Sequence, residues 1–364
     1  MIKNFYNYNW FFIFIVSVIA IIGFIALYSA ADANLDLWAR KQIIRFVFGL
    51  ILLFIISVID IKFWYKNINT IFLLSLALLV SVEVFGIFGF GARRWIKIFN
   101  ISIQPSEFIK ITLILFLAKY YNEIKFEKIY MLRNLIIPIF AIFIPAILVL
   151  FQPDLGTALT IVALGLMILF ISGVKIWKFV LAFFAMLISL PLIWKFVLKD
   201  YQIKRILSFI NPESDLLGSG YHLYQSKIAL GSGGFYGKGY LKGSQSYLDF
   251  LPEKQTDFIF TLIGEEFGFI GTIFVLVLYL ILILNTFYIG FKAFNVFSRI
   301  VAIGVGTNLF LYVICNSAMV TGLLPVVGVP LPLISYGGSV MISIMISFGF
   351  LMNVNVYQFR KKIW

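Results

Sequence analysis

The chain has 364 residues, of which 62% are hydrophobic and only 12% are charged, and its mean hydropathy is +1.02. Soluble domains typically contain about 45–50% apolar and about 25% charged residues. This composition argues against a soluble enzyme, a disordered tail and a nucleic-acid-binding module. We therefore expect lipid to be the main solvent of the chain, and we expect no nucleic-acid partner.

The formal net charge of +13 fits this interpretation. Lys and Arg residues beside membrane spans set the topology, and they attract anionic head groups, including those of pyrophosphate-bearing lipids. The one cysteine, Cys315, lies in an apolar run and excludes an intrachain disulfide. The one histidine, His222, excludes an HExxH zinc site. Carboxylate-based chemistry and a pure binding function remain open.

A helix that crosses the hydrocarbon core needs about 20 mostly apolar residues. The apolar runs predict ten such helices, near residues 10–30, 42–59, 68–88, 105–121, 134–151, 156–173, 177–197, 258–289, 300–322 and 333–356. The first run is longer than the core of a signal peptide and further spans follow it, so we interpret it as a retained anchor. The predicted fold class is an all-α polytopic membrane protein with a single transmembrane domain over residues 1–364.

The Lys and Arg residues of the short loops predict the orientation. With the N-terminus in the cytoplasm, the inner segments hold fourteen of them and the outer short loops hold six. This asymmetry favours both termini inside. Three of the outer cations lie at 93–97 and run against the rule, which suggests that they have another function.

The segment between about residues 198 and 257 is not membrane-like. It is rich in glycine and polar residues, and it follows the seventh predicted span. The predicted topology therefore makes it a large extracytoplasmic loop between helices 7 and 8. A loop of this length in an otherwise tight bundle is usually functional.

Several motifs in this loop and around it form a recognisable set. In the loop region they are residues 221–239 (YHLYQSKIALGSGGFYGKG), 250–260 (FLPEKQTDFIF) and 264–268 (GEEFG). Elsewhere they are residues 93–96 (RRWI), 104–110 (QPSEFIK), 152–157 (QPDLGT) and 322–338 (GLLPVVGVPLPLISYGG). Together, and in this order, they resemble the SEDS family (shape, elongation, division, sporulation). The residues of the motifs QPDLGT, GEEFG and GVPLP are more similar to the RodA elongation branch than to the FtsW division branch.

The resemblance implies a peptidoglycan glycosyltransferase that polymerises lipid II into glycan strands during cell elongation and cell-shape maintenance. It implies a multi-pass protein of the bacterial cytoplasmic (inner) membrane. It also implies work with a class B penicillin-binding protein, which is a transpeptidase, and with the elongation machinery. The family's essential catalytic aspartate falls on Asp257.

From the residues alone, Asp257 has two interpretations. Pro252 suits the first turn of a helix, which would place Asp257 in the second turn of the eighth span, on one face with Glu253. There it is an interfacial helix cap or a general base. The spacing favours the cap, and the resemblance reverses that preference. As a base, Asp257 would deprotonate an attacking sugar hydroxyl in an inverting displacement, while cations stabilise the leaving pyrophosphate.

The predicted substrate-binding residues lie on the same side of the membrane as this base. The outer cations available for the pyrophosphate are Arg93, Arg94, Lys227, Lys238 and Lys242. Gln225 and Glu253 complete the predicted outer set. Alternatively, many of these charges are ordinary solvated residues of a loop. The glycine-rich segment 231–239 fails the Walker spacing, but its backbone N–H groups and Lys238 could touch pyrophosphate.

Glu107 and Lys110 lie inside the fourth predicted span, three residues apart on one face. Each isolated charge there would cost roughly 2.5–3.5 kcal/mol, so we expect the two to pair. The pair shapes the substrate cavity, as the resemblance implies, or it only locks the helix packing. Asp154 lies in a very short outer loop, and we expect it to cap the sixth helix.

The resemblance also implies a divalent cation, Mg or Mn, for which Asp249, Glu253 and Asp257 offer hard oxygen ligands. Two other functions compete with the glycosyltransferase. A flippase or transporter for the lipid-linked precursor would use intramembrane charges and broken helices, but it needs no large outer loop. A non-catalytic cell-wall scaffold would tolerate changes inside the cavity.

Overall fold

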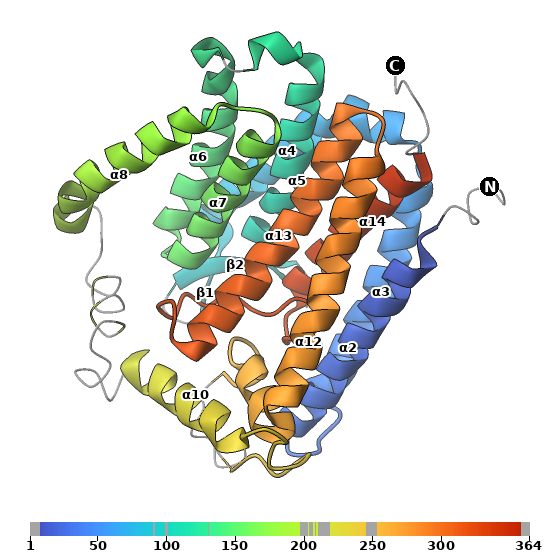
Figure 1. Cartoon of the computed structure of the whole chain (residues 1–364), viewed down its shortest axis with the longest axis vertical. Coiled ribbons are helices and arrows are strands. Elements are labelled where there is room, and N and C mark those ends of the chain that lie inside the picture. The colour runs from blue at the N-terminus through green and yellow to red at the C-terminus, as the bar shows by residue number, and fades with distance from the viewer. Residues whose placement is uncertain are drawn as a thin grey trace.

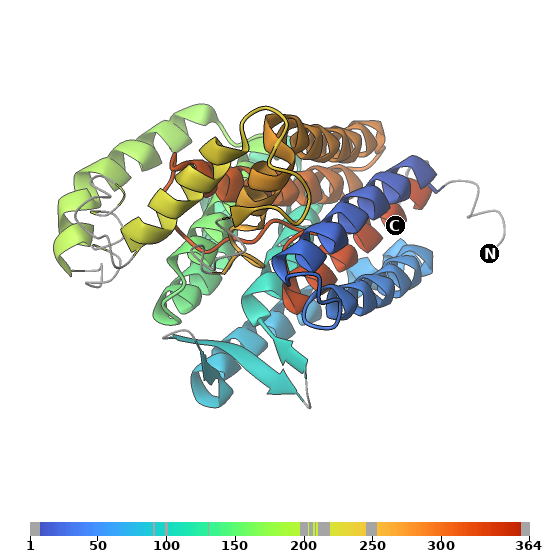
Figure 2. The ribbon, with the colours of Figure 1, turned by 90° about the horizontal axis from the view of Figure 1, so that it is seen from below.

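The computed structural model of the chain describes residues 8–357, except 90–91, 99–100, 130, 197–202, 204–206, 208, 210–218 and 245–252. Its helices form a bundle, and a small sheet lies on one flank (Figures 1 and 2). Two short 3-10 helices, η1 (Phe126–Lys128) and η2 (Leu132–Leu135), lie between the helices α5 and α6 of this bundle.

Each predicted span coincides with one helix of the described chain, so the predicted fold class is confirmed. These helices are α2 (Trp10–Ala30), α3 (Ala39–Val58), α4 (Ile61–Phe85), α5 (Pro105–Glu123), α6 (Ile136–Phe151), α7 (Leu155–Ile171), α8 (Ile176–Phe196), α12 (Ile259–Lys292), α13 (Val296–Thr321) and α14 (Gly338–Tyr357). Among the described residues, seven helices are long and apolar enough to cross a membrane. Helix α7 and the apolar part of α8 are shorter, and α5 holds the charged Glu107 and Lys110.

A three-stranded antiparallel sheet follows α4, where the sequence predicted helix up to residue 88. Its strands are β1 (Ile87–Gly89), β2 (Ala92–Ile98) and β3 (Ile101–Ile103), in the order β1-β2-β3. Gly86 ends α4 in an extended conformation, so the next residues satisfy their backbone groups by strand pairing instead of helix bonds. Strand β2 contacts α4 and α5, and β3 contacts α14.

The long segment between α8 and α12 contains a further helix, α10 (Ser219–Gly233), which the sequence pattern did not reveal. Its Ser226 is fully buried, with a hydroxyl 2.9 Å from that of Thr261, and it donates a hydrogen bond to the carbonyl of Val320 at 2.9 Å. Helix α10 therefore packs on α12 and α13 (Figure 1). A contact face that contains polar side chains produces no clear apolar period, so the hydropathy pattern does not predict this helix.

Helix α12 is interrupted at Gly268, whose backbone has φ 67° and ψ −161°. This conformation is essentially restricted to glycine. The glycine-rich segment 234–239 fills the interruption. The N–H groups of Phe269 and Ile270 donate to carbonyls of this segment at 2.9 and 3.2 Å. The segment thus supplies hydrogen-bond partners that the interrupted helix cannot provide for itself.

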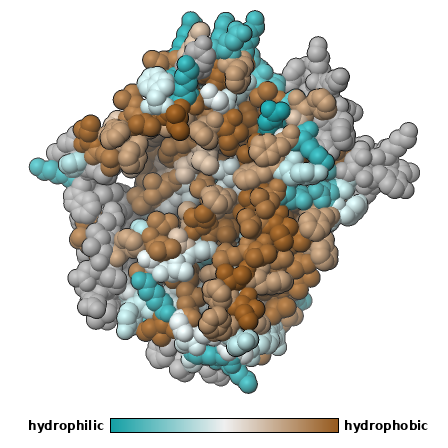
Figure 3. Space-filling model, viewed as in Figure 1, coloured by the Kyte–Doolittle hydropathy of each residue, from teal (hydrophilic) through white to brown (hydrophobic). Residues whose placement is uncertain are grey.

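Helix α2 begins and α14 ends at one end of the bundle, and α10 lies at the opposite end (Figure 1). Helix α8 stands apart from the other helices in both ribbon views (Figures 1 and 2). On the face shown in Figure 3, hydrophobic residues cover most of the middle and hydrophilic residues gather towards the two ends. This distribution is that of a surface in contact with hydrocarbon.

Gly268→Ala should lower the thermal stability of the protein. A Cβ at this position would lie 2.4 Å from the amide nitrogen of Gly237, and alanine avoids the required backbone conformation. We expect a loss of about 1–3 kcal/mol, measured by thermal unfolding of the purified protein in detergent. Gly231→Ala is the matched control, because a Cβ there would meet nothing within 4 Å. Equal melting temperatures of the two variants would contradict this role of Gly268.

Candidate active site

Asp257 lies in the turn 253–258, directly before α12 begins at Ile259. The prediction that it belongs to the second turn of the eighth span is therefore wrong. The backbone of Glu253 has φ 54°, a left-handed conformation that a right-handed helix does not contain. Glu253 and Asp257 consequently do not share a helix face. Glu253 is exposed to solvent, and Asp257 is half-buried.

Three successive carbonyl groups hold the backbone of this turn. The two residues before Asp257 accept hydrogen bonds from the backbone N–H of Tyr336, at 2.8 Å, and from the hydroxyl of Ser335, at 2.6 Å. The carbonyl of Asp257 itself accepts a hydrogen bond from the side-chain amide of Asn316 at 2.9 Å. The donors come from α13 and from the segment before α14, so long-range contacts fix the backbone that carries the Asp257 carboxylate.

Asn316 is fully buried in α13 and joins two segments of the site. Besides the carbonyl of Asp257, its side-chain amide reaches the carbonyl of Val329 at 2.8 Å. A Cβ at Gly328 would lie only 3.3 Å from Oδ2 of Asp257, so the carboxylate lies against the backbone of segment 328–330. Helix α13 thus fixes both the turn that carries Asp257 and the segment on which its carboxylate lies.

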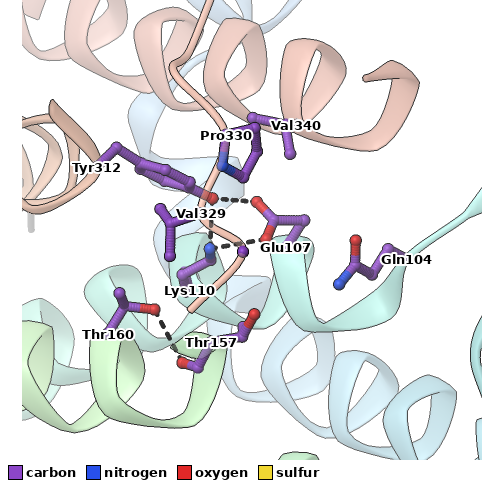
Figure 4. A pocket seen from close by; sticks show the side chains of 10 residues that line it. Gln104, Glu107, Lys110, Thr157, Thr160, Tyr312, Val329, Pro330 and Val340 are labelled. Carbon is purple, nitrogen blue, oxygen red and sulfur yellow. Dashed lines mark hydrogen bonds and ion pairs between the residues drawn. The ribbon is translucent and has the colours of Figure 1, made fainter. Parts of the chain in front are cut away.

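Glu107 and Lys110 form the predicted ion pair, with Nζ of Lys110 2.8 Å from Oε1 of Glu107. Tyr312 of α13 completes a buried triad, because its hydroxyl donates to Oε2 of Glu107 and accepts from the ammonium group of Lys110 (Figure 4). Only 3%, 1% and 3% of Glu107, Lys110 and Tyr312 are exposed. The triad satisfies both charges inside the bundle and links α5 to α13.

The triad lines a cavity of about 30 Å³ (Figure 4). Gln104, Thr157 and Thr160 contribute further polar side chains, and segment 328–330 forms another part of the wall. This volume exceeds the roughly 10–15 Å³ that one water molecule needs. Segment 328–330 therefore contacts the Asp257 carboxylate and also borders a polar cavity large enough for water.

Sequence reasoning missed Tyr312 and Asn316. The two residues are four positions apart in α13, so they lie on the same helix face. A tyrosine and an asparagine at this spacing in an otherwise apolar span indicate a face that contacts polar groups inside the bundle. That signal was available in the sequence, but it does not identify the partners.

The structure places Arg93 and Arg94 on β2, where they have different roles. Arg93 is exposed. The guanidinium of Arg94 donates to the carbonyl of Gln152 at 3.2 Å and to that of Pro153, and it lies 3.9 Å from Asp154. Arg94 therefore holds the turn between α6 and α7. The predicted cap is confirmed in the same turn, because Oδ1 of Asp154 accepts from the first turn of α7 at 3.2 Å.

Lys238 and the glycine-rich segment are engaged within the protein. The ammonium group of Lys238 lies 2.8 Å from the carboxylate of Glu265 and 2.8 Å from the hydroxyl of Ser244. The N–H groups of Lys238 and Gly239 donate at 3.0 Å to the carbonyls of Glu265 and Glu266 in α12. These two N–H groups are thus used to close the interruption in α12, and the idea that they touch pyrophosphate has no support from this geometry.

The other predicted loop residues lie on or near α10. Lys227 is exposed, and its ammonium group lies 2.6 Å from the position that a Cβ of Gly322 would take, at the end of α13. Gln225 is half-buried, and Lys242 is exposed beyond the glycine-rich segment. The predicted outer residues are consequently spread over β2, α10, the following loop and the turn before α12.

The three residues suggested as ligands of a divalent cation do not share one environment. Asp249 lies outside the described residues, and Glu253 is exposed while Asp257 is half-buried. In the part of the chain that the structure describes, no group of three His, Cys, Asp or Glu side chains comes together as a metal site. The suggested ligands therefore do not form a site for a divalent cation within the described residues.

Comparison with known proteins gives matches over nearly the whole chain. A model of the FtsW, RodA and SpoVE family of cell cycle proteins matches residues 7–360. The peptidoglycan glycosyltransferase MrdB of Escherichia coli K12 is 39% identical over 335 residues, which cover 92% of this chain and 90% of MrdB. The stage V sporulation protein E of Bacillus subtilis 168 is 37% identical over 357 residues, which cover 95% and 96% of the two chains.

Solved structures give the same result. A chain from a peptidoglycan synthase complex that coordinates polymerization and crosslinking superposes with a TM-score of 0.85 at 27% identity, covering 97% of this chain and 99% of the other. The rod shape determining protein RodA of Thermus thermophilus superposes with a TM-score of 0.73 at 25% identity, covering 97% and 98%. Sequence and structure therefore agree that this multi-pass membrane protein belongs to the FtsW, RodA and SpoVE family of cell cycle proteins.

Proposed function

We propose that this protein is a peptidoglycan glycosyltransferase that polymerises lipid II into glycan strands during cell elongation. Its curated relatives MrdB and FtsW carry the name of that activity. The single structural observation that supports the assignment is the position of Asp257, in a turn whose backbone is fixed by three hydrogen bonds from distant segments. A general base must be held in place relative to its substrates, and this turn provides that rigidity.

In the proposed reaction Asp257 acts as the base. Its carboxylate accepts the proton of the acceptor sugar hydroxyl while the hydroxyl oxygen forms a bond to C1 of the donor sugar. The bond between C1 and the pyrophosphate oxygen breaks, and the pyrophosphate leaves as an anion. Such a leaving group needs positive charge rather than an acid, so one carboxylate is sufficient and C1 is inverted.

The buried triad of Glu107, Lys110 and Tyr312 lines a cavity bordered by segment 328–330, against which the Asp257 carboxylate lies. Because its charges already satisfy one another, the triad is suited to hold α5 and α13 at a fixed separation rather than to bind a charged substrate. We assign it a positioning role.

The same proposal places the reaction on the outer face of the bacterial cytoplasmic membrane. The excess of Lys and Arg in the inner segments favours cytoplasmic termini, with α10 and the turn of Asp257 outside. A class B penicillin-binding protein is the partner that fits, since crosslinking must follow polymerisation. The similar chain from a synthase complex that coordinates polymerization and crosslinking supports this choice.

Asp257→Asn tests the proposed function. The change preserves shape and removes the proton acceptor, so glycan-strand synthesis from labelled lipid II should fall at least about 100-fold, as for other general bases. Thermal unfolding should change little, because the change keeps the three backbone carbonyls that accept hydrogen bonds from α13 and the segment before α14. Asp36→Asn is the matched control, since Asp36 is an exposed carboxylate before α3. Near-normal polymer from Asp257→Asn would overturn the assignment and favour a transporter or a scaffold.

Lys110→Met should destabilise the protein strongly, by about 3–5 kcal/mol, because it leaves a buried carboxylate without its counter-ion. The double variant Glu107→Gln with Lys110→Met should regain part of this loss, since no uncompensated charge remains. Thermal unfolding and the level of protein in the membrane measure both effects. If the single variant is as stable as the unchanged protein, the pair does not have the structural role described here.

Asn316→Ala should lower kcat for polymerisation about 10- to 100-fold and leave KM for lipid II nearly unchanged. The variant removes the donor that holds the carbonyl of Asp257, so the base loses its alignment while the binding surfaces remain. Ser317→Ala is the control, because the hydroxyl of Ser317 bonds only within α13 among the described contacts. A purely structural role for Asn316 would instead lower the melting temperature without this separation of kcat from KM.

A further inference from the structure

The first turns of helix α3 carry two cations, Lys41 and Arg45, that have no role in the proton transfer to Asp257. Lys41 and Arg45 lie beyond the outer end of the first span, where the rule for Lys and Arg disfavours them. Both line a cavity of about 530 Å³ that is bounded by α3, β3, α5 and α14. This is within the range of sites that hold small molecules, and it is much larger than the cavity beside the Glu107–Lys110 pair.

The cavity is cationic at one end and apolar at the other. Lys41, Arg45 and Phe48 are spaced four and three residues apart, so they lie on one face of α3. With a rise of about 1.5 Å per residue, Phe48 lies about 10 Å deeper along the helix than Lys41. Phe108 of α5 and Ile342 of α14 extend the apolar wall. An outer-leaflet lipid has the same order, with an anionic head at the surface and an apolar chain below.

No carboxylate among the described residues neutralises the two cations. In the described residues, the neighbouring Arg40 is paired with Asp36 at 2.8 Å, whereas neither Lys41 nor Arg45 has a carboxylate within 4.0 Å. The guanidinium of Arg45 lies over Gly338, the first residue of α14, where a Cβ would be 3.2 Å from its Nε. An anion at this place would meet the guanidinium and the positive end of the α14 dipole together.

Arg45 is also connected to the candidate base. It lies 4.5 Å from the ring centroid of Tyr336 and donates to the hydroxyl of Tyr336 at 3.2 Å. The backbone N–H of the same Tyr336 donates to the carbonyl of Gln255, two residues before Asp257. Tyr336 therefore links the cationic end of this cavity to the turn that carries the Asp257 carboxylate.

We propose that this cavity, called the α3 groove below, binds the polyprenyl chain of a lipid-linked substrate. The pyrophosphate of the substrate would lie at Lys41 and Arg45. The proposal rests on the proposed function, and it assigns the pyrophosphate to α3 instead of to Arg94 and Lys238, each of which has a carboxylate within 4.0 Å. The connection through Tyr336 selects a substrate over a bulk phospholipid, because only a substrate needs its pyrophosphate beside the base. The groove thereby orients C1 of the sugar, or the acceptor hydroxyl, towards Asp257.

The test is equilibrium binding of a labelled polyprenyl pyrophosphate to the purified full chain in detergent. Arg45→Gln and Lys41→Gln should each weaken binding at least tenfold, because each removes a charge-assisted contact. Ile342→Trp, which fills the apolar end, should weaken it as well. Arg40→Gln removes the same charge one residue away and should bind as the unchanged protein does. Lys41 is exposed, so its variant remains informative even if the other changes disturb folding.

A competition experiment identifies the ligand. An equal concentration of phosphatidylglycerol should not displace the polyprenyl pyrophosphate. Displacement to the same extent would overturn the proposal and make the groove a general site for anionic lipids. Wild-type affinity in both Arg45→Gln and Lys41→Gln would overturn it as well.

The groove and the proposed function can fail separately. Asp257→Asn should bind the polyprenyl pyrophosphate with unchanged affinity while it makes no polymer. If the unchanged protein makes polymer and the affinity does not depend on Arg45, the groove is wrong and the glycosyltransferase stands. If the affinity depends on Arg45 but no polymer forms under any condition, the groove stands and the glycosyltransferase is wrong.

Discussion

In lipid every backbone N–H and C=O group needs a partner from the chain itself, and the irregular parts of this protein are built around that need. At Gly268 the helix α12 is interrupted, and the segment 234–239 supplies the missing partners. In the turn before α12, α13 and the segment before α14 supply donors to three successive carbonyls. The bonds that satisfy this turn are the same bonds that position Asp257, so stability and geometry have one origin.

The charged side chains of the site fall into two groups, those with a charged partner inside the protein and those without one among the described residues. Glu107 and Lys110 are buried and compensate one another with the help of Tyr312. Arg94 donates to two carbonyls of a turn and lies 3.9 Å from the carboxylate of Asp154. Charges that the protein satisfies itself belong to its framework, because moving them to a ligand would break existing contacts. Arg45 has the opposite character, since it faces an apolar groove and is held only by neutral partners among its described contacts.

The predictions that succeeded were those that depend on short-range physics. The spans could be predicted because the thickness of a bilayer sets the length of an apolar run. The Glu107–Lys110 pair and the Asp154 cap followed from helix geometry over three residues. The helical placement of Asp257 failed because Glu253 adopts a left-handed conformation, which the proline-based pattern does not reveal. The small sheet and α10 were missed because weak local patterns are stabilised by packing on distant helices.

By itself, the sequence determined the membrane class, the helices, the family resemblance and Asp257 as the candidate base. Only the tertiary structure decided which polar residues surround that base. Asn316 meets Asp257 across 59 positions, and Arg45 meets Tyr336 across 291. Contacts at such separations depend on how helices pack rather than on the period of any one segment. Helix packing is set by the fit of many side chains at once, and for that reason no local pattern encodes it.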